Sequence, residues 1–149
     1  GRSAGGLLVA AVSILRPELY RNVLAGVPFV DVLTTMSDAS IPLTTGEWLQ
    51  VGNTNIKRYY EYISKYSPVD NIKEGICYPN YYVNAGLNDP RVAYWEPAKF
   101  VASMRYSMPK DCKSIILLNT NMESGHFNSS DRYKSLEEIS ERYAFLVSM

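Results

Sequence analysis

Three short apolar runs, separated by longer segments with helical periodicity, constrain the fold of this chain more than any other feature. The runs are residues 23–27, 81–86 and 114–118, and Pro, Gly, Asn or Ser lie at their boundaries. Runs of this length that are apolar on both faces are typical of strands buried in a parallel sheet.

The segments between the runs predict helices over residues 7–15, 56–66, 94–106 and 131–147, and a long loop with short helical turns over residues 28–55. In the last helix, one stripe at spacings of three and four predicts an apolar face. That stripe is Tyr133, Leu136, Ile139, Tyr143 and Leu146, and the expected solvated face is Lys134, Glu137, Glu138, Glu141 and Arg142. The order helix, strand, helix, strand, helix, strand, helix predicts an α/β sheet of parallel strands with crossover helices.

Composition narrows the class of function. The 149 residues suffice for one domain, and 15 basic residues balance 15 acidic ones. We therefore expect no nucleic-acid partner, which would need a basic face. No apolar run approaches the roughly 18–20 residues that cross a bilayer, so we expect no membrane partner.

Metal-ligating residues are scarce. The chain has one histidine and two cysteines, Cys77 and Cys112. A structural zinc site takes four such ligands, so we expect no metal and no cofactor. Two free thiols in a reducing compartment are the simpler interpretation of the cysteines, and a disulfide remains the alternative.

The first five residues, GRSAG, fit the G-x-S-x-G nucleophile elbow, with Ser3 as the nucleophile. In that motif the serine lies on a sharp strand-to-helix turn, where glycines avoid clashes with neighbouring backbone. The apolar helix after Ser3 agrees with this context, and the backbone N–H of Ala4 is the expected oxyanion donor. An isolated match to so short a pattern is weak.

Two further residues strengthen this interpretation. In this class of hydrolases the acid and then the histidine follow the serine along the chain. Asp89 follows the second predicted strand and His126 follows the third. Active-site residues of open α/β sheets gather beyond the carboxyl ends of strands, so the spacing predicts a Ser3, Asp89, His126 triad.

Several longer blocks resemble the oligopeptidase B group of the prolyl oligopeptidase family, most of all its trypanosomatid members. They are GRSAGGLL at residues 1–8, GVPFVDV at 26–32, IPLTTGEW at 41–48, YSP at 66–68, DPRVAYWEPAK at 89–99 and SGH at 124–126. The resemblance covers the chain nearly end to end.

The resemblance implies a cytosolic (cytoplasmic) serine oligopeptidase with an α/β-hydrolase fold that cleaves short peptides after Arg or Lys. It also implies that residues 1–149 are the C-terminal part of the peptidase domain. Upstream hydrolase strands and a β-propeller would belong to the same longer chain. Since the family's second oxyanion donor, a tyrosine hydroxyl, lies in that upstream part, we expect the isolated chain to be nearly inactive.

The resemblance also bears on substrate selection. A basic side chain needs a carboxylate partner, and the resemblance assigns this role to Glu47. The family's further acidic positions are Leu49 and Gln50 here, and Val51 replaces a usual tryptophan. These departures weaken the expectation of strict Arg or Lys preference.

Two other hypotheses remain. The triad alone does not choose the acyl substrate, so another α/β hydrolase, such as an esterase or an acylaminoacyl peptidase, is the runner-up. A noncatalytic remnant of the fold is the second, and the altered residues 49–51 are its only support.

Overall fold

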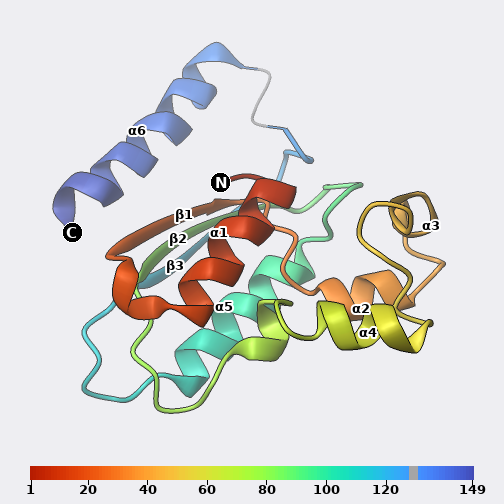
Figure 1. Cartoon of the computed structure of the whole chain (residues 1–149). Helices are drawn as coiled ribbons and strands as arrows, with labels where there is room; N and C mark the ends of the chain where they lie inside the picture. Colours follow the sequence, from red (N-terminus) through yellow and green to blue (C-terminus); the bar gives the residue numbers. More distant parts are fainter. Residues whose placement is uncertain (128–130) are drawn as a thin grey trace.

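The computed structural model describes residues 1–127 and 131–149. In chain order the elements are α1 (Ala4–Leu15), η1 (Pro17–Leu19), β1 (Asn22–Gly26), α2 (Val32–Ser37), α3 (Thr44–Glu47), α4 (Lys57–Ile63), η2 (Val69–Asn71), β2 (Asn80–Gly86), α5 (Trp95–Ser107), β3 (Ile116–Asn121) and α6 (Arg132–Ser148). Helices α1 and α5 cover one face of the sheet, and α6 lies over the other (Figure 1).

The three strands form a parallel sheet in the order β1-β2-β3, as the alternation of elements predicts. The third strand differs from the apolar run at 114–118, since it begins at Ile116 and continues to Asn121. Its polar end still pairs with β2, where Asn119 lies opposite Asn84 and Asn121 opposite Gly86. Backbone pairing extended this strand beyond its apolar residues, and hydrophobicity alone cannot indicate that.

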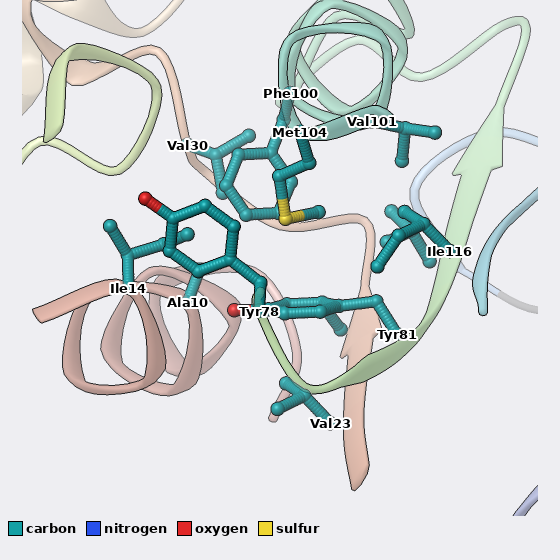
Figure 2. Packing of buried hydrophobic residues seen from close by; sticks show 12 residues of the cluster. Ala10, Ile14, Val23, Val30, Tyr78, Tyr81, Phe100, Val101, Met104 and Ile116 are labelled. Carbon is teal, nitrogen blue, oxygen red and sulfur yellow. The ribbon is translucent and has the colours of Figure 1, made fainter. Parts of the chain in front are cut away.

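Side chains from α1, the strands and α5 form the main core (Figure 2). Tyr81 lies at its centre, with its ring edge-on to Phe100 and its hydroxyl against the Ser13 hydroxyl. Because side chains alternate along a strand, the next residue, Tyr82, points to the opposite face and contacts Phe145 of α6. The sheet is thus covered on both faces, which explains the continuous apolar runs.

The prediction of a final helix is confirmed, but the prediction of which face it buries is wrong. Its apolar stripe faces outward, with Tyr133 77% exposed and Tyr143 65% exposed. Part of the expected solvated face contacts the sheet instead, where the Glu141 carboxylate accepts hydrogen bonds from Tyr82 Oη at 2.7 Å and Asn119 Nδ2 at 2.9 Å. Lys134 and Glu137 of the same face remain exposed. The orientation of this helix depends on polar side chains of the strands. The periodicity of the helix's own sequence gives no information about those partners.

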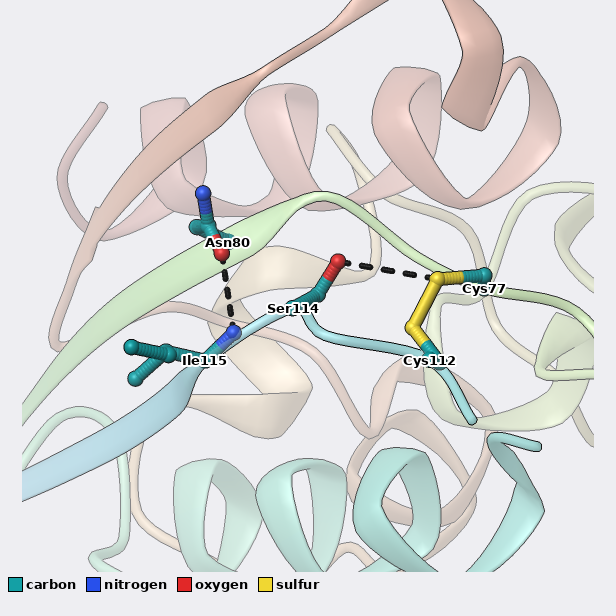
Figure 3. The surroundings of a disulfide bond; sticks show 5 residues. All are labelled: Cys77, Asn80, Cys112, Ser114 and Ile115. Atoms are coloured by element: carbon teal, nitrogen blue, oxygen red, sulfur yellow. Dashed lines mark hydrogen bonds between the residues drawn. A yellow bond between two sulfur atoms is a disulfide. The ribbon is translucent and has the colours of Figure 1, made fainter. Parts of the chain in front are cut away.

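The expectation of two free thiols is also wrong, because Cys77 and Cys112 form a disulfide (Figure 3). It joins the segments that lead into β2 and β3, at the amino ends of these strands. The cysteines are 35 residues apart in sequence, and parallel pairing of the two strands brings their starts together. Within the described residues, no helix is long and apolar enough to cross a membrane.

Candidate active site

Ser3 lies between a strand-like segment and a helix. Residue Arg2 forms a parallel bridge with Gly26, the last residue of β1. The Gly26 N–H donates to Gly1 O at 2.9 Å, and the Ser3 N–H donates to Gly26 O at 2.9 Å. Helix α1 begins at the next residue, Ala4. Residues 1–4 therefore make a strand-to-helix turn, the geometry that the nucleophile-elbow motif predicts.

The backbone is strained at this turn. Among residues 1–127 and 131–149, the non-glycine residues with positive φ are Ser3 at 54°, Val27 at 36° and Leu43 at 72°. Positive φ is unfavourable for residues with a Cβ atom, and such strain gathers at functional sites.

Two glycines make the close packing of the elbow possible. A Cβ atom on Gly1 would lie 2.1 Å from Gly5 O, and one on Gly6 would lie 2.7 Å from the Cα atom of Pro28. Both clashes are with backbone, which cannot move aside. These positions therefore admit only glycine without displacement of the turn.

Asp89 and His126 lie beyond the carboxyl ends of β2 and β3 and meet there. The Nδ1 atom of His126 is 2.8 Å from Asp89 Oδ2, and both side chains are buried. The other Asp89 oxygen, Oδ1, accepts the N–H groups of Arg91 at 2.8 Å and Val92 at 2.9 Å. One oxygen of the carboxylate is therefore fixed by the N–H groups of its own turn, while the other contacts the imidazole.

The segments that carry Asp89 and His126 pack closely against each other at Gly86 and Gly125. A Cβ atom on Gly86 would lie 2.3 Å from Gly125 O and 2.9 Å from Ser124 O. The Asn88 N–H donates to Ser124 O at 3.2 Å across the same contact. From the elbow, the Arg2 guanidinium donates to the backbone oxygen of His126. The histidine loop is thus held from the acid side and from the serine side.

Ser3 shares a cavity of about 150 Å³ with Glu47, the last residue of α3. Its walls are mainly apolar, and polar residues line it from four segments, at Ser3, Thr35, Thr44 with Glu47, and Arg91. The residues around Ser3 and Glu47 are Ala4, Leu7, Phe29, Thr35, Met36, Pro42, Leu43, Thr44, Val51, Arg91 and Val92. The structure therefore brings the predicted site together in two pairs, Asp89 with His126 and Ser3 with Glu47, at the same edge of the sheet.

The residues that depart from the expected family pattern at positions 49–51 have different surroundings. Val51 lines the cavity, whereas Leu49 is 97% exposed. Among the residues that the structure describes, no group of three or more His, Cys, Asp or Glu side chains is placed to hold a metal ion.

The Prolyl oligopeptidase family model matches residues 1–149, the whole chain. The chain belongs to the prolyl oligopeptidase family. A search of curated proteins finds "Protease 2" of Moraxella lacunata and "Dipeptidyl aminopeptidase BI" of Pseudoxanthomonas mexicana, each 48% identical over 147 residues.

Solved structures of the family confirm the α/β-hydrolase fold. Oligopeptidase B from Leishmania major superposes with a TM-score of 0.94 at 55% identity over 99% of this chain. The Trypanosoma brucei enzyme with covalently bound antipain gives the same TM-score at 53% identity. The expected trypanosomatid resemblance is therefore confirmed. This chain spans 20% of each of these proteins and about a fifth of the curated relatives.

The sequence analysis did not predict three residues that form or support the cavity beside Ser3. Thr35 and Val92 line the cavity, and Glu96 accepts a hydrogen bond from the Thr35 hydroxyl. No sequence signal marked Glu96, because a carboxylate in the first turn of a helix is ordinary. Its burial depends on a partner loop more than sixty residues away, as the 65-residue separation from Asp31 illustrates.

Proposed function

We propose that this chain is the C-terminal part of the catalytic domain of a serine oligopeptidase, with Ser3, Asp89 and His126 as its triad. The observation that supports it most is the 2.8 Å contact between His126 Nδ1 and Asp89 Oδ2. The strained turn of Ser3 is linked to it by Arg2, which donates to the backbone oxygen of His126. A serine, a carboxylate and a histidine that follow one another in this order along the chain are the residues that catalyse acyl transfer in α/β hydrolases.

In this mechanism the Ser3 Oγ atom attacks the scissile carbonyl carbon, and His126 Nε2 accepts the hydroxyl proton. The same proton then passes to the leaving amine as the C–N bond breaks, which leaves an acyl-enzyme ester on Ser3. Water, deprotonated by His126, hydrolyses the ester and restores the serine. Asp89 keeps the Nδ1 proton of His126 in place and stabilises the imidazolium.

Negative charge on the carbonyl oxygen needs donors, and we assign one to the backbone N–H of Ala4. Ala4 is the first residue of α1, where helix N–H groups lack intrahelical partners. A second donor and the strand before Ser3 would come from an upstream part of a longer chain that also holds the propeller. Loss of one donor costs on the order of 10²–10³ in turnover, so the isolated 149 residues would be nearly inactive.

Glu47 supports a preference for Arg or Lys at P1, the residue before the cleaved bond, because it lines the same cavity as Ser3 and carries a carboxylate. The apolar walls of that cavity, among them Leu7, Phe29 and Met36, favour the second candidate, a hydrolase of esters or of peptides with apolar P1 residues. We also propose a cytosolic location, which the resemblance supports; a reducing compartment of this kind would open the Cys77–Cys112 disulfide. Fractionation of the source cells tests that location.

The deciding experiment uses fluorogenic peptides with Arg, Lys, Pro or Phe at P1 and a simple nitrophenyl ester. The full-length protein is compared with its Ser3→Ala variant, and a fluorophosphonate probe reports the reactive serine. Cleavage after Arg and Lys that the variant loses is expected. A preference for Phe or for the ester would favour the second candidate, and absence of any serine-dependent turnover or labelling would favour a noncatalytic remnant.

A further inference from the structure

Glu96 is a buried carboxylate that the catalytic mechanism does not use. It is the second residue of α5 and only 2% exposed. Its Oε2 atom accepts the N–H groups of Val30 at 3.1 Å and Asp31 at 3.0 Å, and its Oε1 atom accepts the Thr35 hydroxyl at 2.7 Å. Three donors from one short segment therefore converge on one carboxylate.

The segment that Glu96 holds is a wall of the cavity beside Ser3. Phe29, Thr35 and Met36 line that cavity. The backbone oxygen of Thr35 accepts the Thr44 hydroxyl at 3.0 Å, and Thr44 lines the cavity from the segment that carries Glu47. The hydrogen bonds of Glu96 thus extend through Thr35 to both sides of the cavity.

The other end of this network is the turn that contains Asp89, the partner of His126. Asp89 Oδ1 accepts the Val92 N–H, and Val92 also lines the cavity. The Glu96 N–H donates to Ala93 O at 3.0 Å, so the turn leads directly into α5. One helical turn later, Lys99 Nζ lies 2.7 Å from Asp31 Oδ2, which is a second link to the same wall.

Burying a carboxylate at this position costs desolvation free energy. Burial raises the pKa of Glu96, because desolvation disfavours its charged form. An apolar side chain of similar size would avoid that cost. Unlike an apolar side chain, the carboxylate accepts hydrogen bonds from the two backbone N–H groups and the Thr35 hydroxyl. Without it, these buried donors would lose their partner.

We propose that Glu96 is a positioning residue for substrate selection, which fixes the wall formed by residues 29–36 relative to Ser3 and to the Asp89 turn. The inference rests on the proposed function, since it assigns the cavity to the P1 side chain. Glu96 itself touches no substrate.

The test uses the full-length protein and three variants. Glu96→Ala removes the acceptor, Glu96→Gln retains one acceptor oxygen for the two amides and can donate to Thr35, and Glu18→Ala removes an exposed carboxylate as the control. The two substrates are a peptide with Arg at P1 and nitrophenyl acetate, whose acyl group does not fill the cavity. Rates are normalised to the fraction of Ser3 that labels with fluorophosphonate.

We expect Glu96→Ala to lower kcat/KM for the peptide at least about tenfold, mainly through KM, because buried donors are left unpaired. Its rate on the acetate should change less than about twofold, and Glu96→Gln should recover the peptide rate to within about threefold. Equal losses on the two substrates, or no loss on either, would overturn the proposal. If Glu96→Ala does not fold, Thr35→Val removes one donor and should give a smaller loss with the same selectivity.

Hydrogen exchange separates this proposal from the proposed function. In Glu96→Ala, or in Thr35→Val if that variant is used, the amides of residues 29–36 should exchange faster while those of residues 80–86 in β2 stay protected. This result is expected even if the protein hydrolyses nothing. Unchanged protection of residues 29–36 would overturn the positioning role, whatever the enzyme assays give.

Discussion

The imidazole of His126 and the carboxylate of Asp89 form a buried pair, with 2.8 Å between Nδ1 and Oδ2. The pair joins two loops at the carboxyl ends of neighbouring parallel strands. Because the second Asp89 oxygen is held by two backbone N–H groups, the orientation of the imidazole follows from the fold of the turn.

Replacement of Asp89 by asparagine tests the role of this pair. The amide fills the same space but removes the charge and can force the wrong imidazole tautomer. We expect kcat of the full-length protein to fall by about 10⁴ with little change in KM. Steady-state kinetics on the preferred peptide measure it, with Asp111→Asn, an exposed residue, as the control. A loss below tenfold would contradict a triad role for Asp89.

Gly86→Ala tests the contact between the acid and histidine loops. The added Cβ would lie 2.3 Å from Gly125 O, so one loop must move away from the other. We expect destabilisation of about 1–3 kcal/mol and a larger fractional loss of kcat than of folded protein. Thermal unfolding and kinetics are compared with Gly46→Ala, where a Cβ meets nothing within 4 Å. Native activity in Gly86→Ala would argue that the two loops are not tightly coupled.

The pattern of strands and helices could be predicted because each is marked by local periodicity. The candidate triad was predicted from the G-x-S-x-G motif at Ser3 and from the places of Asp89 and His126 after predicted strands. The buried face of α6 could not. Glu141 lies against the sheet because Tyr82 and Asn119 donate to it, and those partners lie elsewhere in the chain.

The same reason explains why Glu96 and the disulfide escaped prediction. Glu96 receives donors from residues 30–35, and Cys77 meets Cys112 only after β2 and β3 pair. Contacts between distant segments set the details of the site, whereas local sequence set its framework. Ser3 shows both, since a local motif predicts the turn and the pairing with Gly26 holds it.

Glu47→Gln tests the selection of basic P1 residues. A charge-assisted hydrogen bond contributes about 1.5–3 kcal/mol, so kcat/KM for a peptide with Arg at P1 should fall roughly 10–100-fold. The rate for Phe at P1 should stay the same or rise. Glu61→Gln, on the exposed face of α4, is the matched control. Equal effects on Arg and Phe peptides would remove Glu47 from substrate selection.

The pKa of Glu96 predicts how its burial affects stability with pH. Below the unfolded pKa, about 4.3, the carboxyl is protonated in both states and burial carries no charge penalty. As pH rises through the higher folded pKa, the ionised form opposes folding, because desolvation and the Asp31 carboxylate outweigh its hydrogen bonds. Lys99 pairs with Asp31. The advantage in unfolding free energy of Glu96→Gln over the wild type should therefore increase with pH above about 4 and then level off.

Glu18→Gln provides the opposite case, because hydrogen bonding to Arg16 lowers the pKa of Glu18. Its stability relative to the wild type should fall as pH rises. Denaturant unfolding between about pH 4 and pH 8 measures both series. A flat or falling difference for Glu96→Gln would contradict the raised pKa.

Reduction of the Cys77–Cys112 disulfide should lower stability and leave the chemistry intact. The bond lies at the amino ends of β2 and β3, whereas Asp89 and His126 follow their carboxyl ends, about 20 Å away along a strand of 7 residues. Closing a loop between cysteines 35 residues apart stabilises by roughly 2–4 kcal/mol, so dithiothreitol should lower Tm by several degrees. The kcat measured well below Tm should not change. A Cys77→Ser, Cys112→Ser double variant should show the lower Tm without reductant and no response to it. A fall in kcat on reduction of the wild type, absent from the double variant, would instead link this end of the sheet to the catalytic residues.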